Sequence, residues 1–190
     1  MPSSPRISPA ALLLAGVAAA YPFLVYAALG RVPPGALIVV ALAVVGGRMA
    51  AARRANSAGV LLPALGGVFA ATGVLALLDA DAAVLAYPVL MNLGFAAAFG
   101  LSLLKPPTLV ESLASLRHPN PSPAGRAYMR RVTVVWFVFL LGNATVSAAT
   151  AVHGDMALWT LYNGLVAYLL MGLLFAVEFL VRRRVQGRAA

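Results

Sequence analysis

The sequence predicts an all-α, polytopic membrane protein with six transmembrane helices, and its composition and its charge distribution are the two observations that predict it. Of its 190 residues, 62% are hydrophobic and only 10% are charged, whereas a soluble domain carries about 25% charged residues. A soluble chain of this length has too little interior to bury so much apolar surface. The net charge of +9 does not indicate nucleic-acid binding, because the basic residues cluster between apolar runs, as membrane orientation signals do.

Six apolar stretches form the predicted spans, since a helix needs about 20 residues to cross the hydrocarbon core of a bilayer. They cover roughly residues 9–29, 35–52, 58–78, 82–104, 132–152 and 156–181, in a single transmembrane domain over residues 1–190. The second stretch is marginal, because its apolar part ends at Gly47. We therefore expect Arg48 to extend its side chain to the headgroups.

The basic residues predict the topology. Thirteen of the fourteen Lys and Arg residues fall on one side of this arrangement, and only Arg31 falls on the other. An excess of basic residues marks the cytoplasmic side, so both termini are expected in the cytoplasm. A cleaved signal peptide is the rival interpretation of the first apolar run. The continuation of that run to Leu29, without a hydrophilic start of a mature chain, argues against cleavage.

The connection over residues 105–131 begins KPPTLVESLASLRH and predicts a short interfacial helix between the fourth and fifth spans. Pro106 and Pro107 end the fourth span because proline has no backbone N–H to donate. Thr108 and Glu111 have the spacing of a capping box, which starts a new helix. The leucine face of this helix is expected to lie at the acyl boundary. That face holds Leu109, Leu113 and Leu116, and the polar face holds Glu111, Ser112, Ser115 and Arg117.

The next helix is predicted to start at Ser122 and Pro123, as a cap followed by a first-turn proline, and to continue into the fifth span. The connection has two interpretations that the sequence leaves open. It is either a spacer that sets the tilt of the helices or a cytoplasmic docking and anionic-lipid site. The candidate residues of such a site are Lys105, Glu111, Arg117, Arg130 and Arg131.

Glu178 is the acidic residue that the predicted spans place inside the membrane. Arg182, four residues later, can form an ion pair with it on the same helical face, and Arg131 on the fifth span is a second candidate partner. The alternative role for Glu178 is that of a proton-handling carboxylate.

Three asparagines are predicted to lie in the outer half of the membrane, at depths of about 15, 14 and 10 Å by helical rise. They are Asn92, Asn143 and Asn163, and Tyr21 and Tyr87 are expected at similar depths. These five residues either line a ligand or lipid pocket or form hydrogen bonds between helices. Close packing of the helices would be permitted by small residues, namely Gly94, Ala98, Gly142 and Gly172.

Motifs for catalysis or cofactor binding do not occur in the sequence. It contains no cysteine, which excludes thiolate chemistry and cysteine metal sites. His118 and His153 fall on opposite sides of the membrane, and no H-E-x-x-H, P-loop or nucleotide-binding glycine pattern is present. The sequence therefore predicts neither catalytic residues nor a metal or other cofactor.

The segments LSLLKPPTLVESLA, RAYMRRVTVVWFVFLLGNATVSAATA and WTLYNGLVAYLLMGLLFAVEFLVRRRV resemble a family of uncharacterised bacterial inner-membrane proteins. Members of that family are often encoded in aryl-polyene or xanthomonadin-type clusters. The layout is more distantly similar to that of the intracellular septation protein A family. The resemblance assigns no roles to the family-like positions, which are Lys105, Pro106, Pro107, Glu111, Arg130, Arg131, Asn143, Asn163, Gly164 and Glu178.

The resemblance implies an accessory, non-enzymatic component of envelope or aryl-polyene-type lipid biosynthesis, which holds a lipophilic molecule or docks partners. The alternative is a structural protein of septation or envelope maintenance, and a third interpretation is a small transporter or membrane enzyme that uses Glu178. The expected partners are membrane lipids and cytoplasmic biosynthetic or division proteins, without nucleic acid.

Overall fold

The computed structural model describes residues 20, 23, 26–27, 31–54, 58–115 and 120–187, and each regular element in this part of the chain is helical. Five helical segments are long and apolar enough to cross a membrane, in agreement with the second to sixth predicted stretches. The predicted first stretch, residues 9–29, lies almost entirely outside the described residues. The elements are α2 (Pro34–Arg54), α3 (Ala58–Leu78), α4 (Ala80–Leu104), α5 (Leu109–Ser115), α6 (Pro123–His153), α7 (Met156–Leu161), the π-helical turn η1 (Tyr162–Val166) and α8 (Ala167–Gly187).

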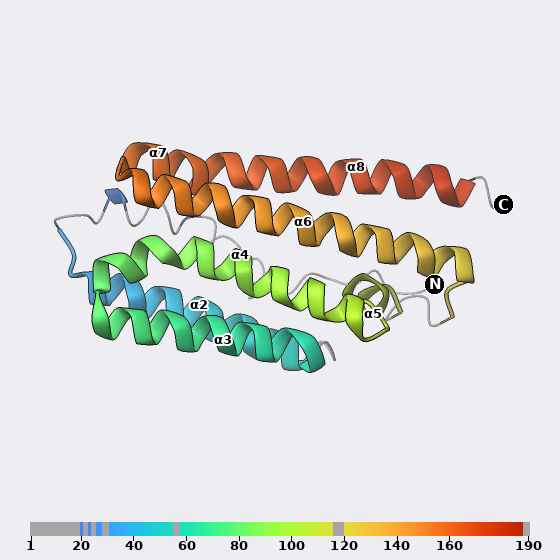
Figure 1. Ribbon diagram of the computed structural model, residues 1–190, viewed down its shortest axis with the longest axis horizontal. Coiled ribbons are helices and arrows are strands. Elements are labelled where there is room, and N and C mark those ends of the chain that lie inside the picture. The colour runs from blue at the N-terminus through green and yellow to red at the C-terminus, as the bar shows by residue number, and fades with distance from the viewer. Residues whose placement is uncertain are drawn as a thin grey trace, which may run out of the picture.

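The long helices lie side by side along one axis, and consecutive ones run in opposite directions (Figure 1). Helix α4 occupies the centre of the bundle, in contact with α2 and α3 on one side and with α6 on the other. The short α5 lies where α4 ends and α6 begins. The last residues of α2 and α4 and the first residues of α3 and α6 therefore share one end of the bundle with the last residues of α8.

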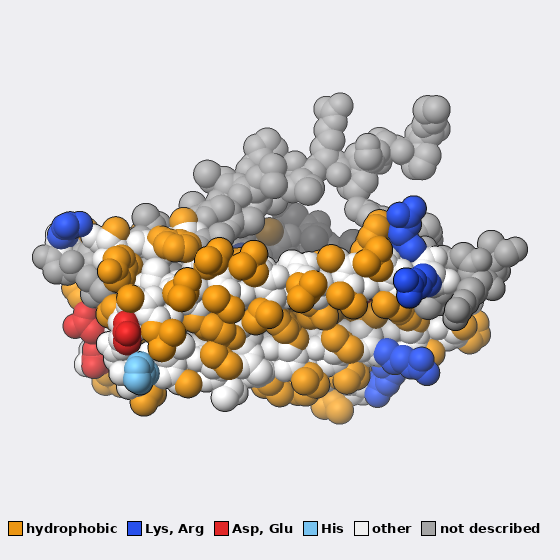
Figure 2. All heavy atoms as spheres, turned by 90° about the horizontal axis from the view of Figure 1, so that it is seen from above, with side chains coloured by type: hydrophobic (Ala, Val, Ile, Leu, Met, Phe, Trp, Pro, Cys, Tyr) orange, Lys and Arg blue, Asp and Glu red, His pale blue; other side chains and the backbone are white. Residues whose placement is uncertain are grey.

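The surface between the two ends of the bundle is apolar. Figure 2 shows acidic and histidine side chains at one end, most of the visible Lys and Arg at the other, and hydrophobic side chains between them. Only 11% to 39% of the residues in each candidate span are buried, and every long helix carries large exposed hydrophobic side chains. This is the arrangement expected of a protein that is solvated by lipid along its length.

Polar residues at the helix ends satisfy backbone groups that the helices leave without partners. The Asp79 carboxylate accepts a hydrogen bond from the Ala82 N–H, and Asp155 accepts bonds from the first turn of α7. Ser122 accepts a hydrogen bond from the Gly125 N–H (3.1 Å), with Pro123 at the first position of α6. The predicted start of this helix is therefore confirmed.

Only some of the small residues named above allow close packing of the helices. Gly94 is buried, and a Cβ atom there would collide with the side chain of Val68 on α3. The expectation of close packing is wrong for Gly142 and Gly172, which are exposed and have open space around the Cβ position. Of these four residues, Gly94 and the buried Ala98 are compatible with a close approach of neighbouring helices to α4.

Helix α5 is attached to the bundle instead of lying only on the acyl boundary. Leu109 is buried, and its N–H donates to the Ser102 hydroxyl of α4 (2.9 Å), whereas Leu113 is 45% exposed. Thr108 caps Glu111 through its hydroxyl (3.4 Å). The Glu111 carboxylate lies 3.8 Å from Arg126 of α6, and the Glu111 side chain is only 16% exposed. Leu116 lies outside the described residues.

Candidate functional site

Two of the three asparagines contact each other directly, in a chain of hydrogen bonds that we call the amide ladder. Asn143 of α6 donates from Nδ2 to Oδ1 of Asn92 on α4 (2.9 Å). Tyr162 of η1 donates from its hydroxyl to Oδ1 of Asn143 (2.7 Å). Asn92 donates in turn to the Pro88 carbonyl, four residues earlier in its own helix (2.8 Å). The ladder therefore links three segments of the chain.

Asn163 belongs to a second group of hydrogen bonds between α6 and the α7–η1 segment. Its Oδ1 accepts from the Ser147 hydroxyl (2.6 Å), and its Nδ2 donates to the Trp159 carbonyl (2.9 Å) and to the Thr150 hydroxyl (3.4 Å). All four residues are buried. The amide of Asn163 is thus surrounded by partners from its own chain.

The π turn explains why two consecutive residues both reach α6. On an α-helix, neighbouring residues point about 100° apart, so Tyr162 and Asn163 would not normally face the same helix. A π turn accommodates one extra residue, and here Tyr162 and Asn163 both bond to side chains of α6. The sequence pattern had not included Tyr162, because nothing local to YNGLV distinguishes a π turn from an α turn.

These contacts favour interhelical hydrogen bonding as the role of the asparagines. A ligand in an amide-lined pocket would have to displace bonds that the amides already make with one another. Tyr87 is buried in an apolar cluster that includes Met91 and Trp159, and Tyr21 lies outside the described residues.

Arg48 lies deeper in the apolar band than expected. Its guanidinium carbon is 5.6 Å from the centre of the Phe95 ring, nine residues before the end of α4, or about 14 Å along that helix. Helical side chains lean toward the N-terminus of their helix, and α2 begins at the end opposite the basic one. The expectation that Arg48 extends to the headgroups is therefore wrong.

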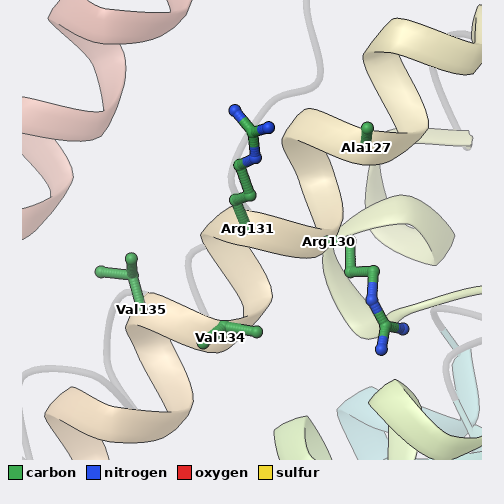
Figure 3. Close-up of a pocket in the computed structure, with 5 residues that line it drawn as sticks. All are labelled: Ala127, Arg130, Arg131, Val134 and Val135. Carbon is green, nitrogen blue, oxygen red and sulfur yellow. The ribbon is translucent and has the colours of Figure 1, made fainter.

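The basic end of the bundle consists of exposed cations on α6 and on the adjoining connection. Arg130 donates to the Leu103 carbonyl in the last turn of α4 (3.0 Å), which leaves most of its five N–H donors available. Lys105 and Arg131 are exposed, and Arg117 lies outside the described residues. A hollow of about 470 Å³ on α6 is lined by Ala127, Arg130, Arg131, Val134 and Val135 (Figure 3).

Glu178 forms the expected i,i+4 pair with Arg182, at 3.8 Å. Among the described residues, Arg131 forms no ion pair with Glu178. Tyr128 of α6 takes that position and donates its hydroxyl to the Glu178 carboxylate at 3.3 Å. This bond and the contact between the Trp136 and Phe175 rings (4.5 Å between centroids) connect α6 to α8.

Comparison of the chain with protein-family models, with curated proteins and with solved structures finds no match. The family resemblance stated above therefore stays a prediction. Across residues 31–54, 58–115 and 120–187, no group of three His, Asp or Glu side chains is arranged to hold a metal ion.

Proposed function

We propose that the chain is a non-enzymatic inner-membrane protein whose basic end binds anionic lipid headgroups, as an accessory component of envelope or aryl-polyene-type lipid biosynthesis. The hollow on α6 is the observation that supports this proposal. Arg130 and Arg131 extend from opposite sides of the helix, and Val134 and Val135 follow one turn further into the apolar band (Figure 3). A phosphate can bind one of these guanidinium groups while its acyl chain lies along the valines.

We infer six spans with both termini in the cytoplasm, the first span coming from residues 9–29. The support is the concentration of Lys and Arg at the end of the bundle that holds α5, because basic segments stay on the cytoplasmic side. A reporter inserted between Pro107 and Ser122 that is active only outside the cytoplasm would contradict this topology.

The exposed cations of this end also suit acidic partner proteins of the cytoplasm. The pairing of Glu111 with Arg126 holds α5 beside the start of α6. In this proposal Lys105, Arg130 and Arg131 form the binding face and Glu111 has a positioning role.

The test is the double variant Arg130→Gln/Arg131→Gln in a bacterial strain that lacks the wild-type chain. We expect several-fold less of the lipid product in outer-membrane extracts at an unchanged level of the protein, because two of the phosphate-binding cations are gone. Arg31→Gln is the matched control, since it removes an exposed cation from the opposite end of the bundle.

A normal lipid profile in the double variant and in a deletion strain would overturn the proposal. If those strains then failed in division or in osmotic resistance, the septation alternative would replace it.

A further inference from the structure

The C-terminal span is the least buried of the candidate spans. Only 11% of the residues over Met156–Arg184 are buried, compared with 17% to 39% in the other four. Its apolar side chains, such as Leu169 (62% exposed) and Leu173 (61% exposed), lie at the surface of the described part of the chain. Lipid solvates an apolar face as well as another helix does, so exposure alone does not show what covers this span.

Gly164 of η1 shows that a segment of this chain covers the beginning of that face. A Cβ atom at Gly164 would lie 2.6 Å from Cε2 and 2.7 Å from Cζ of Phe23. Both distances are shorter than van der Waals contact, so the Phe23 ring occupies the space that a side chain at position 164 would fill. Membrane helices approach one another closely at such small residues. Phe23 belongs to the first predicted apolar stretch, residues 9–29.

Phe23 and Gly164 also have matching depths in the membrane. The stretch that precedes α2 reaches the bundle at the end where α7 lies, because α2 begins there (Figure 1). Phe23 is six residues before Leu29, and Gly164 is eight residues after Met156. In helices these separations correspond to about 9 and about 12 Å from that end. Two helices packed side by side require such an agreement.

We propose that the apolar stretch of residues 9–29 packs antiparallel on the π turn η1 and the first turns of α8, with Gly164 as the point of closest approach. One helical turn further into the membrane, Ala20 faces Tyr168. A small residue then lies opposite an aromatic ring at both levels, so the side chains interdigitate. Ala20 is partly buried, as this packing requires.

The π turn gives this packing its direction. Tyr162 and Asn163 bond to α6, whereas the next residue, Gly164, contacts Phe23. The turn therefore binds α6 with two residues and the first stretch with the third. The proposal rests on the first of the six spans inferred above, and it does not depend on lipid binding at the basic end.

The test is a disulfide cross-link, because the chain contains no cysteine and an introduced pair reports a single contact. The double variant Phe23→Cys/Gly164→Cys is oxidised with copper phenanthroline in native membranes and analysed by non-reducing electrophoresis. Phe23→Cys removes the ring and so leaves room for the side chain at position 164. We expect a disulfide within one chain, because a disulfide needs Cβ atoms only about 4 Å apart.

Phe23→Cys/Gly142→Cys is the matched control, since Gly142 is an exposed glycine of α6 with open space at its Cβ position. The Phe23→Cys/Gly164→Cys pair should form its disulfide at least tenfold faster than this control. Ala20→Cys/Tyr168→Cys tests the antiparallel register and should also cross-link within one chain.

Three results would overturn the proposal. Equal rates for the position 164 pair and the control would show that the contact is not specific, and a disulfide between two chains would assign this face to a second copy. An intact mass of the purified wild-type chain that lacks the first stretch would do so without any variant. If the cross-link failed while the reporter between Pro107 and Ser122 remained cytoplasmic, the packing would be refuted and the topology would stand.

Discussion

The amide ladder and Arg48 are both polar and both lie within the apolar band, yet they have opposite hydrogen-bonding states. Asn92, Asn143 and Tyr162 are neutral, and each amide or hydroxyl both donates and accepts, so the three residues satisfy one another. A guanidinium only donates, and its Nε has no acceptor within the described part of the chain. Neutral groups that both donate and accept therefore satisfy one another at membrane depth, whereas a cation that only donates is left with an unsatisfied N–H.

The largest effect that tests this comparison is expected for Asn143→Leu. The change removes both bonds of the residue and leaves Asn92 and Tyr162 without their partner, at a cost of about 2 kcal/mol in the free energy of unfolding. Unfolding in mixed micelles measures this free energy.

Thr145→Val is the control for Asn143→Leu, because Thr145 is exposed on the same helix and its hydroxyl bonds only to the Leu141 carbonyl of its own helix. Its effect should be within about 0.5 kcal/mol. An Asn143→Leu variant as stable as the wild type would mean that the ladder does not hold the helices together, which would favour the pocket interpretation.

A smaller effect of the opposite sign is expected for Arg48→Met. An arginine near the centre of a transmembrane helix costs about 2.5 to 3.5 kcal/mol, and contact with an aromatic ring offsets about 0.5 to 2 kcal/mol of this. The variant should therefore gain about 1 kcal/mol in unfolding free energy. Arg183→Met is the control, because Arg183 also lies over a phenylalanine ring (Phe179, 5.4 Å) but is exposed at the basic end. A clear loss of stability, with Arg183→Met unchanged in the same measurement, would show that Arg48 is a structural residue.

The smallest effect is expected for Tyr162→Phe, which removes one hydroxyl from the end of the amide ladder. The expected loss is about 0.6 kcal/mol, the average for one hydrogen bond between membrane helices. In a double-mutant cycle with Asn143→Leu, the two changes should be less than additive because they remove the same bond. Full additivity would show that the 2.7 Å contact contributes nothing to stability.

The helices followed from local patterns in the sequence. The apolar runs predicted α3 and α4 to within two residues at each end, and Ser122 with Pro123 marked the start of α6. The bounds of these helices depend on residues that are neighbours in the sequence, so the sequence was sufficient to predict them. The caps at Asp79 and Asp155 were also predictable from residue type.

The site residues were harder to predict because their roles depend on contacts between helices. No local pattern defines the register between α4 and α6. The sequence therefore showed neither that Asn143 meets Asn92 nor that Tyr128 takes the place of Arg131 beside Glu178. The direction of Arg48 was predictable in principle, because helical side chains lean toward the N-terminus of their helix. The ring of Phe95, 47 positions later in the sequence, was not a partner that any local pattern indicated.

The extra residue in η1 determines which way the whole of α8 is turned. Each residue of an α-helix corresponds to about 100° of rotation, so deleting one residue between Tyr162 and Val166 would turn α8 by that angle relative to α7. Phe175 would then leave Trp136, and Glu178, about 18 Å beyond the turn, would leave Tyr128. A length change at a single position would thus expose a different face of the C-terminal helix to lipid without altering any residue on that helix.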